Sequence, residues 1–195
     1  MKAWFSVAAI VCAMGVGPAA LAGVQDKPVR TNPATTGTPP DTNAAKPAMG
    51  ADTTFMKTAS MDGMAEVEHG RLGAQNAASS DVKQFAQRMV DDHGKANAEL
   101  KSLASQKNVT LPAELDAKHK AMQDKLSKLN GPAFDSAYMA HMAAAHKEAV
   151  TLFQREAKTG KDAETKAFAE KTLPTVQEHL KMAQDLSANK TAPSR

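Results

Sequence analysis

The chain has 195 residues, of which 24 are lysine or arginine and 21 are aspartate or glutamate, and its formal net charge is +3. Charges of both signs are interspersed, and no basic block with interleaved aromatic side chains occurs, so we expect no nucleic-acid partner. The sequence contains a single cysteine, Cys12, which excludes a disulfide within the chain.

The first 22 residues have the features of a secretory signal peptide. An apolar run over residues 3–16 follows a lysine, and Ala20-Leu21-Ala22 places small residues before the expected cleavage point. We therefore predict export across the inner membrane, to the periplasm or to an association with the outer membrane. Because Cys12 lies in this segment, thiolate metal sites and cysteine nucleophiles are excluded from the mature chain. The apolar run is shorter than the roughly 20 residues that span a bilayer, and no later segment is as apolar, so we expect no transmembrane segment in the mature chain.

The segment after the signal peptide is rich in proline, threonine, alanine and asparagine over residues 23–51. Such a segment cannot bury enough apolar surface to offset the entropy lost on ordering, so we predict a disordered tether. Residues 188–195 have a similar composition and are predicted to form a flexible tail. One domain, residues 52–187, remains between them.

This domain is predicted to be helical throughout, because β-branched residues are sparse and no long segment alternates with a period of two. Apolar stripes at helical spacing predict four long helices and a shorter one. The expected ranges are residues 52–78, 80–106, 113–129, 132–159 and 162–186, of which 113–129 is the short helix. Pro174 lies inside the last helix and predicts a kink or a restart there. Two helix pairs joined by a longer crossover are typical of ferritin-like bundles. We therefore predict an all-α, ferritin-like four-helix bundle with a short crossover helix between the second and third long helices.

Each long helix carries one titratable residue on or beside its apolar stripe. These residues are Glu66, His93, His146 and His179. Burying such a group alone costs several kcal/mol, so it must be paired, hydrogen-bonded or metal-bound. Helical bundles build metal sites from inward-facing ligands on neighbouring helices. The sequence thus predicts a buried His/Glu cluster, whose four members are candidate ligands for zinc, iron or copper. Two other histidines, His119 and His141, are expected to be exposed to solvent.

Other interpretations of the cluster stay open. Without metal, it would be a hydrogen-bonded polar layer in which Glu66 accepts from histidine N–H groups. Met89, Met142 and Met182 each lie about one turn from a histidine, and thioethers with imidazoles would favour copper, particularly Cu(I). Methionine at this spacing is more often core filler. A ferritin-type di-iron site is not expected, because it needs Glu-x-x-His motifs on two helices and the only such spacing is that of Glu66 and His69.

Four runs of residues carry a resemblance to a known family. They are Gly-Met-Ala-Glu-Val-Glu at 63–68, Phe-Ala-Gln-Arg-Met-Val-Asp-Asp-His at 85–93, Phe-Asp-Ser-Ala-Tyr at 134–138 and Leu-Pro-Thr-Val-Gln-Glu-His-Leu at 173–180. Together they resemble a widespread bacterial family of secreted, ferritin-like proteins of unknown function, often labelled predicted outer membrane proteins. The resemblance covers nearly the whole domain. It implies the helical bundle and an envelope location, and it implies no reaction.

We therefore expect a non-catalytic periplasmic or envelope protein with a buried His/Glu cluster that serves in metal buffering or stress protection. Asp92 or Tyr138 would orient the ligands of a bound metal. One alternative is a metal-dependent oxidoreductase, which would need an open coordination position. Another is a purely structural interaction module in which the polar layer fixes the register of the helices. No catalytic residue is assigned, and the only partner that the sequence indicates is a metal ion.

Overall fold

Small residues on helix α1 (Gly50–Asn76) allow a neighbouring helix to approach closely. A Cβ atom at Gly70 would lie 2.9 Å from the carbonyl oxygen of Ala86, and one at Gly73 would lie 2.6 Å from the Cβ atom of Ala86. Any larger residue at these positions would push α2 (Ser80–Gln106) away from α1. The small-residue face of the first helix therefore sets the spacing of the first helix pair.

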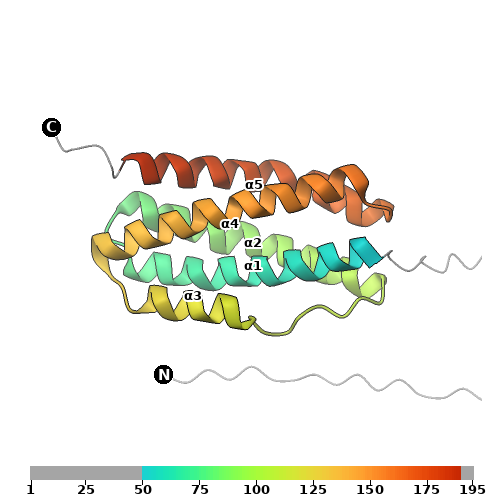
Figure 1. Ribbon diagram of the computed structural model, residues 1–195, viewed down its shortest axis with the longest axis horizontal. Coiled ribbons are helices and arrows are strands. Elements are labelled where there is room, and N and C mark those ends of the chain that lie inside the picture. The colour runs from blue at the N-terminus through green and yellow to red at the C-terminus, as the bar shows by residue number, and fades with distance from the viewer. Residues whose placement is uncertain (1–49, 190–195) are drawn as a thin grey trace, which may run out of the picture. The chain divides into compact units, whose positions relative to one another are not determined.

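The computed structural model, which describes residues 50–189, contains five helices and no strand within that range. Helices α1 and α2 form one pair, and α4 (Gly131–Thr159) and α5 (Ala163–Asn189) form the other (Figure 1). Contacts of α1 with α4 and of α2 with α5 close the bundle, and α3 (Ala117–Ser127) lies against α1 and α4 on the crossover between the pairs. The predicted all-α four-helix bundle with a short crossover helix is confirmed, and the arrangement is consistent with the predicted ferritin-like fold.

The helix boundaries differ from the predicted ones at a few ends. Helix α1 begins at Gly50, two residues before the expected start, and α5 continues through Pro174. Helix α3 is shorter than expected because Asp116 caps it, accepting a hydrogen bond from the backbone N–H of His119 at 2.9 Å. No helix within residues 50–189 combines the length and apolar character that a membrane span requires. The predicted signal peptide, residues 23–49 of the predicted tether and residues 190–195 of the predicted tail lie outside the described residues.

The core consists of two hydrophobic clusters at different levels of the bundle. The first is built around Phe55, Phe153 and Phe168, with the rings of Phe55 and Phe153 packed edge to face at a centroid distance of 5.1 Å. The second contains Phe85 and Tyr138 together with several methionines. Each long helix contributes to both clusters, α1 to the second one through the partly buried Leu72. The stretch between the two contributions of a helix carries one member of the predicted His/Glu cluster. A polar layer therefore separates two apolar cores.

Candidate metal centre

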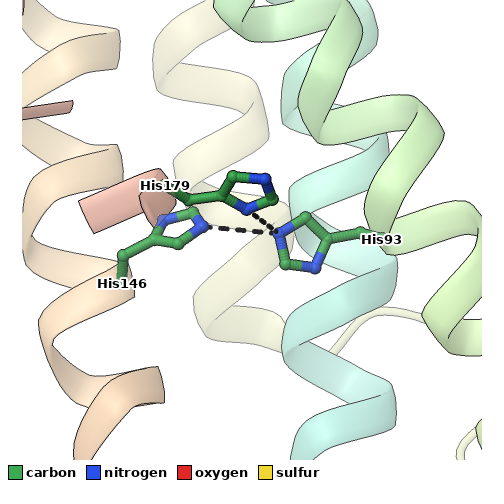
Figure 2. Close-up of side chains that lie close together, drawn as sticks. All are labelled: His93, His146 and His179. Atoms are coloured by element: carbon green, nitrogen blue, oxygen red, sulfur yellow. Dashed lines mark hydrogen bonds between the residues drawn. The ribbon is translucent and has the colours of Figure 1, made fainter. Parts of the chain in front are cut away.

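The four predicted site residues come together in this polar layer, one from each long helix. The side chains of His146 and His179 are fully buried, and Glu66 and His93 are 4% and 7% exposed. Figure 2 shows the three imidazole rings converging from α2, α4 and α5. Three basic groups and a carboxylate are thus held away from water, where each of them needs a partner.

One nitrogen of each histidine points into the centre of the cluster. His93 Nε2 lies 3.3 Å from His146 Nε2 and 3.3 Å from His179 Nδ1. These three nitrogens all lie within 4.8 Å of one another. The imidazoles therefore present three potential ligand atoms to one small volume.

The other nitrogen of each ring is engaged by an oxygen outside this centre. His146 Nδ1 lies 2.9 Å from the backbone carbonyl oxygen of Met142, and His93 Nδ1 lies 3.0 Å from Glu66 Oε2. His179 Nε2 lies 3.1 Å from Asp92 Oδ2. A carbonyl or a carboxylate oxygen only accepts hydrogen bonds, so each of these ring nitrogens carries the proton and donates it. In a neutral imidazole, the inner nitrogen is then left with a lone pair.

The electrostatics of the layer keep its carboxylate ionised. Burial by itself raises the pKa of Glu66, but the neighbouring His93 and His146 outweigh it and lower the pKa to about 2. Burial, and next the neighbouring His93, lowers the pKa of His179 to about 4, and burial also lowers the pKa of His146. For His93, burial acts in the same direction, but the charge and hydrogen bond of Glu66 raise its pKa overall. His93 is thus the histidine of the cluster on which an extra proton is best stabilised.

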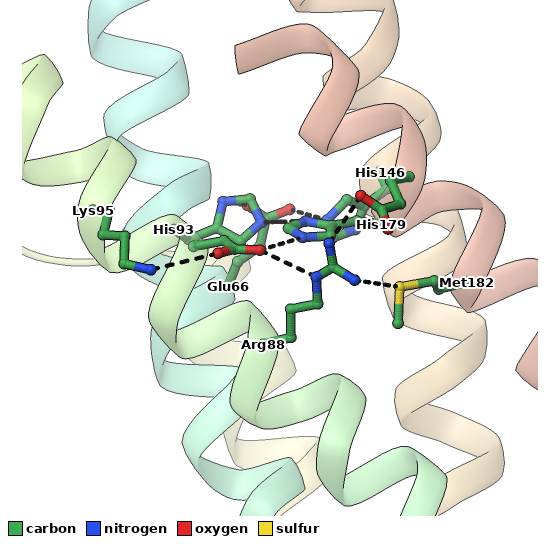
Figure 3. A network of polar contacts seen from close by, with 9 residues as sticks. Glu66, Arg88, His93, Lys95, His146, His179 and Met182 are labelled. Atoms are coloured by element: carbon green, nitrogen blue, oxygen red, sulfur yellow. Dashed lines mark hydrogen bonds and ion pairs between the residues drawn. The ribbon is translucent and has the colours of Figure 1, made fainter. Parts of the chain in front are cut away.

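A network of surface charges covers the α2/α5 side of the cluster (Figure 3). Arg88 Nε donates to Asp92 Oδ2 at 3.2 Å, and a terminal nitrogen of the same guanidinium donates to Glu178 at 2.8 Å. The sulfur of Met182 accepts a further bond from Arg88 at 3.4 Å. Arg88 therefore fixes the Asp92 carboxylate that accepts from His179.

Of the other residues that the sequence analysis named, one lies beside the histidine cluster and the rest lie elsewhere. Asp92 lies where an orienting group is needed, beside His179. Tyr138 lies in the second hydrophobic cluster, where its hydroxyl is buried without a hydrogen-bond partner. Met89 and Met142 also belong to that cluster, as core filler would. The sulfur of Met182 is engaged by Arg88, and no hydrogen bond joins a methionine sulfur to an imidazole in the part of the chain that the structure describes.

The expectation that His119 and His141 are solvated surface residues is wrong. Both are half-buried, and with the fully buried His69 they line a second polar pocket beside the cluster. His141 lies five residues before His146, on a different face of the helix, so the helix stripe gave no signal for it. Only the position of α3 against α1 and α4 creates this pocket.

Several solved structures share the fold of this chain, among them those of two DUF305 proteins and of CopM. A DUF305 fragment from Deinococcus radiodurans aligns with a TM-score of 0.66 at 11% identity over 74% of this chain and 99% of its own. A DUF305 protein from Streptomyces coelicolor, described as secreted, aligns with a TM-score of 0.63 at 15% identity, over 73% of this chain and 93% of its own. CopM in its Cu(II)-bound form aligns with a TM-score of 0.61 at 17% identity, over 71% of this chain and 96% of its own. At these identities the likeness establishes a common fold and nothing more.

Comparison with curated proteins gives no match. Residues 37–186 match the family described as a domain of unknown function, DUF4142. The match spans the four-helix bundle and the polar layer with its three histidines. The chain therefore belongs to the DUF4142 family, whose function is unknown.

Proposed function

We propose that this protein is a non-catalytic envelope protein that binds one transition-metal ion between His93, His146 and His179 and so buffers that metal. The observation that carries the proposal is the direction of the three imidazoles. Each ring donates its N–H outward, to Glu66, the Met142 carbonyl or Asp92, and turns its remaining nitrogen toward the other two.

Three inward lone pairs repel one another unless a cation lies among them. In the absence of metal, a proton on His93 Nε2 fills this role, and the raised pKa of His93 is consistent with it. A metal ion would take the place of that proton and be held by all three nitrogens. Tetrahedral bonds of about 2.0–2.1 Å require ligand nitrogens separated by about 3.3 Å, and two of the three pairs here have this separation.

The outward hydrogen bonds are those that metal-binding histidines need. A carboxylate or carbonyl that accepts from the far nitrogen fixes the tautomer and the ring orientation and makes the ligand more basic. Glu66 does this for His93 and Asp92 does it for His179. We therefore assign Glu66, predicted above as a fourth ligand, to the orientation of His93. Its second oxygen lies 3.6 Å from His146 Nε2.

Copper is the metal that this donor set is expected to hold most tightly. Imidazole suits copper, zinc and iron, and for nitrogen sites the affinity of divalent ions peaks at Cu²⁺. CopM, a protein of the same fold, has been solved in copper-bound form. Because all three ligands are imidazoles, we favour Cu²⁺ over the Cu(I) considered from the methionine spacing. Zinc is the second candidate.

An envelope location is part of the proposal. It is supported by the signal-like first 22 residues and by the Streptomyces coelicolor protein of the same fold, which is described as secreted. Outside the cytoplasm, a buried three-histidine site without cysteine avoids the thiol oxidation that would disable a thiolate site.

The test is metal analysis of the untagged mature chain after reconstitution with Cu²⁺ and, separately, Zn²⁺. We expect one tightly bound ion per chain, lost in His146→Gln and retained in His119→Ala. Circular dichroism would verify that both variants are folded. If no ion binds the wild type, the layer is a structural hydrogen-bonded network and the proposal fails. Turnover of peroxide by the metal-loaded protein would instead favour the oxidoreductase.

A further inference from the structure

A second polar pocket lies beside the buried cluster, between α1, α3 and α4. Its volume is about 240 Å³. The polar residues of its lining that matter here are Asp62, Glu66, His69, His119, His141 and Glu148. Neither the three-histidine site nor the hydrophobic core uses the two neighbouring histidines of this pocket, His69 and His141.

These two histidines face each other with one proton between them. His141 Nε2 lies 3.1 Å from His69 Nδ1, and His69 Nε2 lies 3.3 Å from the backbone carbonyl oxygen of His119. Because the carbonyl only accepts, His69 donates from Nε2, and its Nδ1 accepts from His141. Burial, and next His69, lowers the pKa of His141 to about 4, and burial also lowers the pKa of His69. Both rings are therefore neutral near pH 7, as a metal ligand must be.

The separation of the two nitrogens suits a cation held by both, which would take the place of the proton on His141 Nε2 while that proton moves to Nδ1 of the same ring. At 3.1 Å it is close to the spacing of about 3.3 Å that two imidazole ligands of one tetrahedral ion adopt. Carboxylates of Asp62, Glu66 and Glu148 line the same pocket and favour a cation there. Lys118 lies at its edge, where it pairs with Glu148 at 3.7 Å.

Glu66 connects this pocket with the buried cluster. It lines the pocket and also contacts His93 and His146, at 3.0 and 3.6 Å. On the opposite face, between α2 and α5, the ion pairs of Arg88 with Asp92 and Glu178 cover the cluster (Figure 3). An ion approaching from the α3 side therefore meets His69 and His141 first, and a single carboxylate stands between it and the buried histidines.

We infer that this pocket is the entrance for the metal and that His69 and His141 form a second, weaker metal site in it, which passes the ion to the buried histidines past Glu66. The inference rests on the proposed function, because it needs a metal destined for the buried site. The site is weaker because two imidazoles hold the ion where three hold it inside, and because water reaches the pocket.

The test uses Cu²⁺ alone as the probe, with the full mature chain, and follows binding by calorimetry and by stopped-flow absorbance. For the wild type we expect a tight ion and a weaker second one. In His141→Ala and in the polar substitution His141→Gln, the weaker ion should disappear and loading of the tight site should slow by about tenfold, with its final occupancy unchanged.

His119→Ala is the matched control. His119 lines the same pocket, but its ring nitrogens already face Asp116 at 2.8 Å and Asp62 at 3.5 Å, so its loss should leave the weaker ion in place. His146→Gln should lose the tight ion and keep the weaker one. If the wild type and both His141 variants bind the same number of ions at the same rate, this inference is wrong while the proposed function stands. If the tight ion survives in His146→Gln, the proposed function itself fails.

Discussion

Two buried polar clusters in the bundle differ in how their acceptors are satisfied. Near the start of α1, Asp52 accepts hydrogen bonds from the backbone N–H groups of Lys161 at 2.9 Å and Asp162 at 3.2 Å. Asp162 accepts in turn from the backbone and hydroxyl of Thr165, and Lys107 donates to it at 2.7 Å. In the middle of the bundle, the outer histidine nitrogens are equally well paired, but the inner ones face one another.

The difference separates a structural cluster from a binding one. In the Asp52 cluster, the carboxylates of Asp52 and Asp162 meet backbone, hydroxyl and lysine donors, which caps α5 and fixes a turn. The neighbouring Glu156 is the exception, because its Oε1 has no hydrogen-bond partner. Among the histidines, acceptors converge on a point where the described residues supply no donor beyond the rings themselves. A cation placed there would accept all three nitrogen lone pairs, which the backbone that the structure describes does not do at this point.

The largest expected effect concerns His93, the histidine that contacts both of the other two. His93→Ala leaves the buried carboxylate of Glu66 without its closest donor, which should lower the free energy of unfolding by about 3 kcal/mol. The measurement is urea denaturation in the presence of a chelator, so that metal plays no part. An unchanged unfolding midpoint would mean that His93 does not stabilise the polar layer. The proposed difference between the two clusters would then be wrong.

A smaller effect is expected from the group that orients His179. Asp92→Asn keeps the shape of the side chain and removes its charge, so His179 stays buried but is held less firmly. We expect the affinity for Cu²⁺ to fall about tenfold, with a stability change below about 1 kcal/mol. Competition with a chelator of known affinity measures it. Glu178→Gln is the control, since Glu178 contacts Arg88 and no histidine of the triad, and an equal loss in both variants would contradict the orienting role.

The remaining prediction concerns the structural cluster and depends on pH. Glu156 is 4% exposed, and burial, followed by the neighbouring Asp52, raises its pKa from 4.5 to about 7. A raised pKa means that the fold favours the protonated acid, so the contribution of Glu156 is complete below pH 4.5 and is lost as the pH rises through about 7.

Glu156→Gln should therefore match the wild type at about pH 4.5 and exceed its unfolding free energy by about 2 kcal/mol at about pH 8. Thermal unfolding over this pH range provides the measurement. The exposed Glu170 serves as a control, and Glu170→Gln should show no such gain. Copper affinity should be the same in both variants, because this cluster has no part in the metal site. A change in affinity would show that the two clusters are coupled.

Much of the site was predictable because the bundle is regular. In an α-helix, the apolar stripe identifies the residues that face inward, so Glu66, His93, His146 and His179 could be assigned to the core from spacing alone. Antiparallel pairing then brings them to one level, as observed. Tyr138 was expected to orient a ligand, but its buried hydroxyl has no hydrogen-bond partner. A stripe gives the facing direction of a side chain and not what it touches.

The helix pattern, the crossover and the four inward residues follow from local periodicity and capping, so the order of the amino acids is enough to predict them. Which nitrogen of each histidine points inward depends instead on acceptors such as Asp92 and the Met142 carbonyl. Their positions relative to each ring depend on how the helices and side chains pack. The tertiary structure also decided that His69, His119 and His141 share a pocket, because the pocket forms only where α3 lies against α1 and α4. Helical spacing describes one helix at a time, and a binding site depends on distances between several of them.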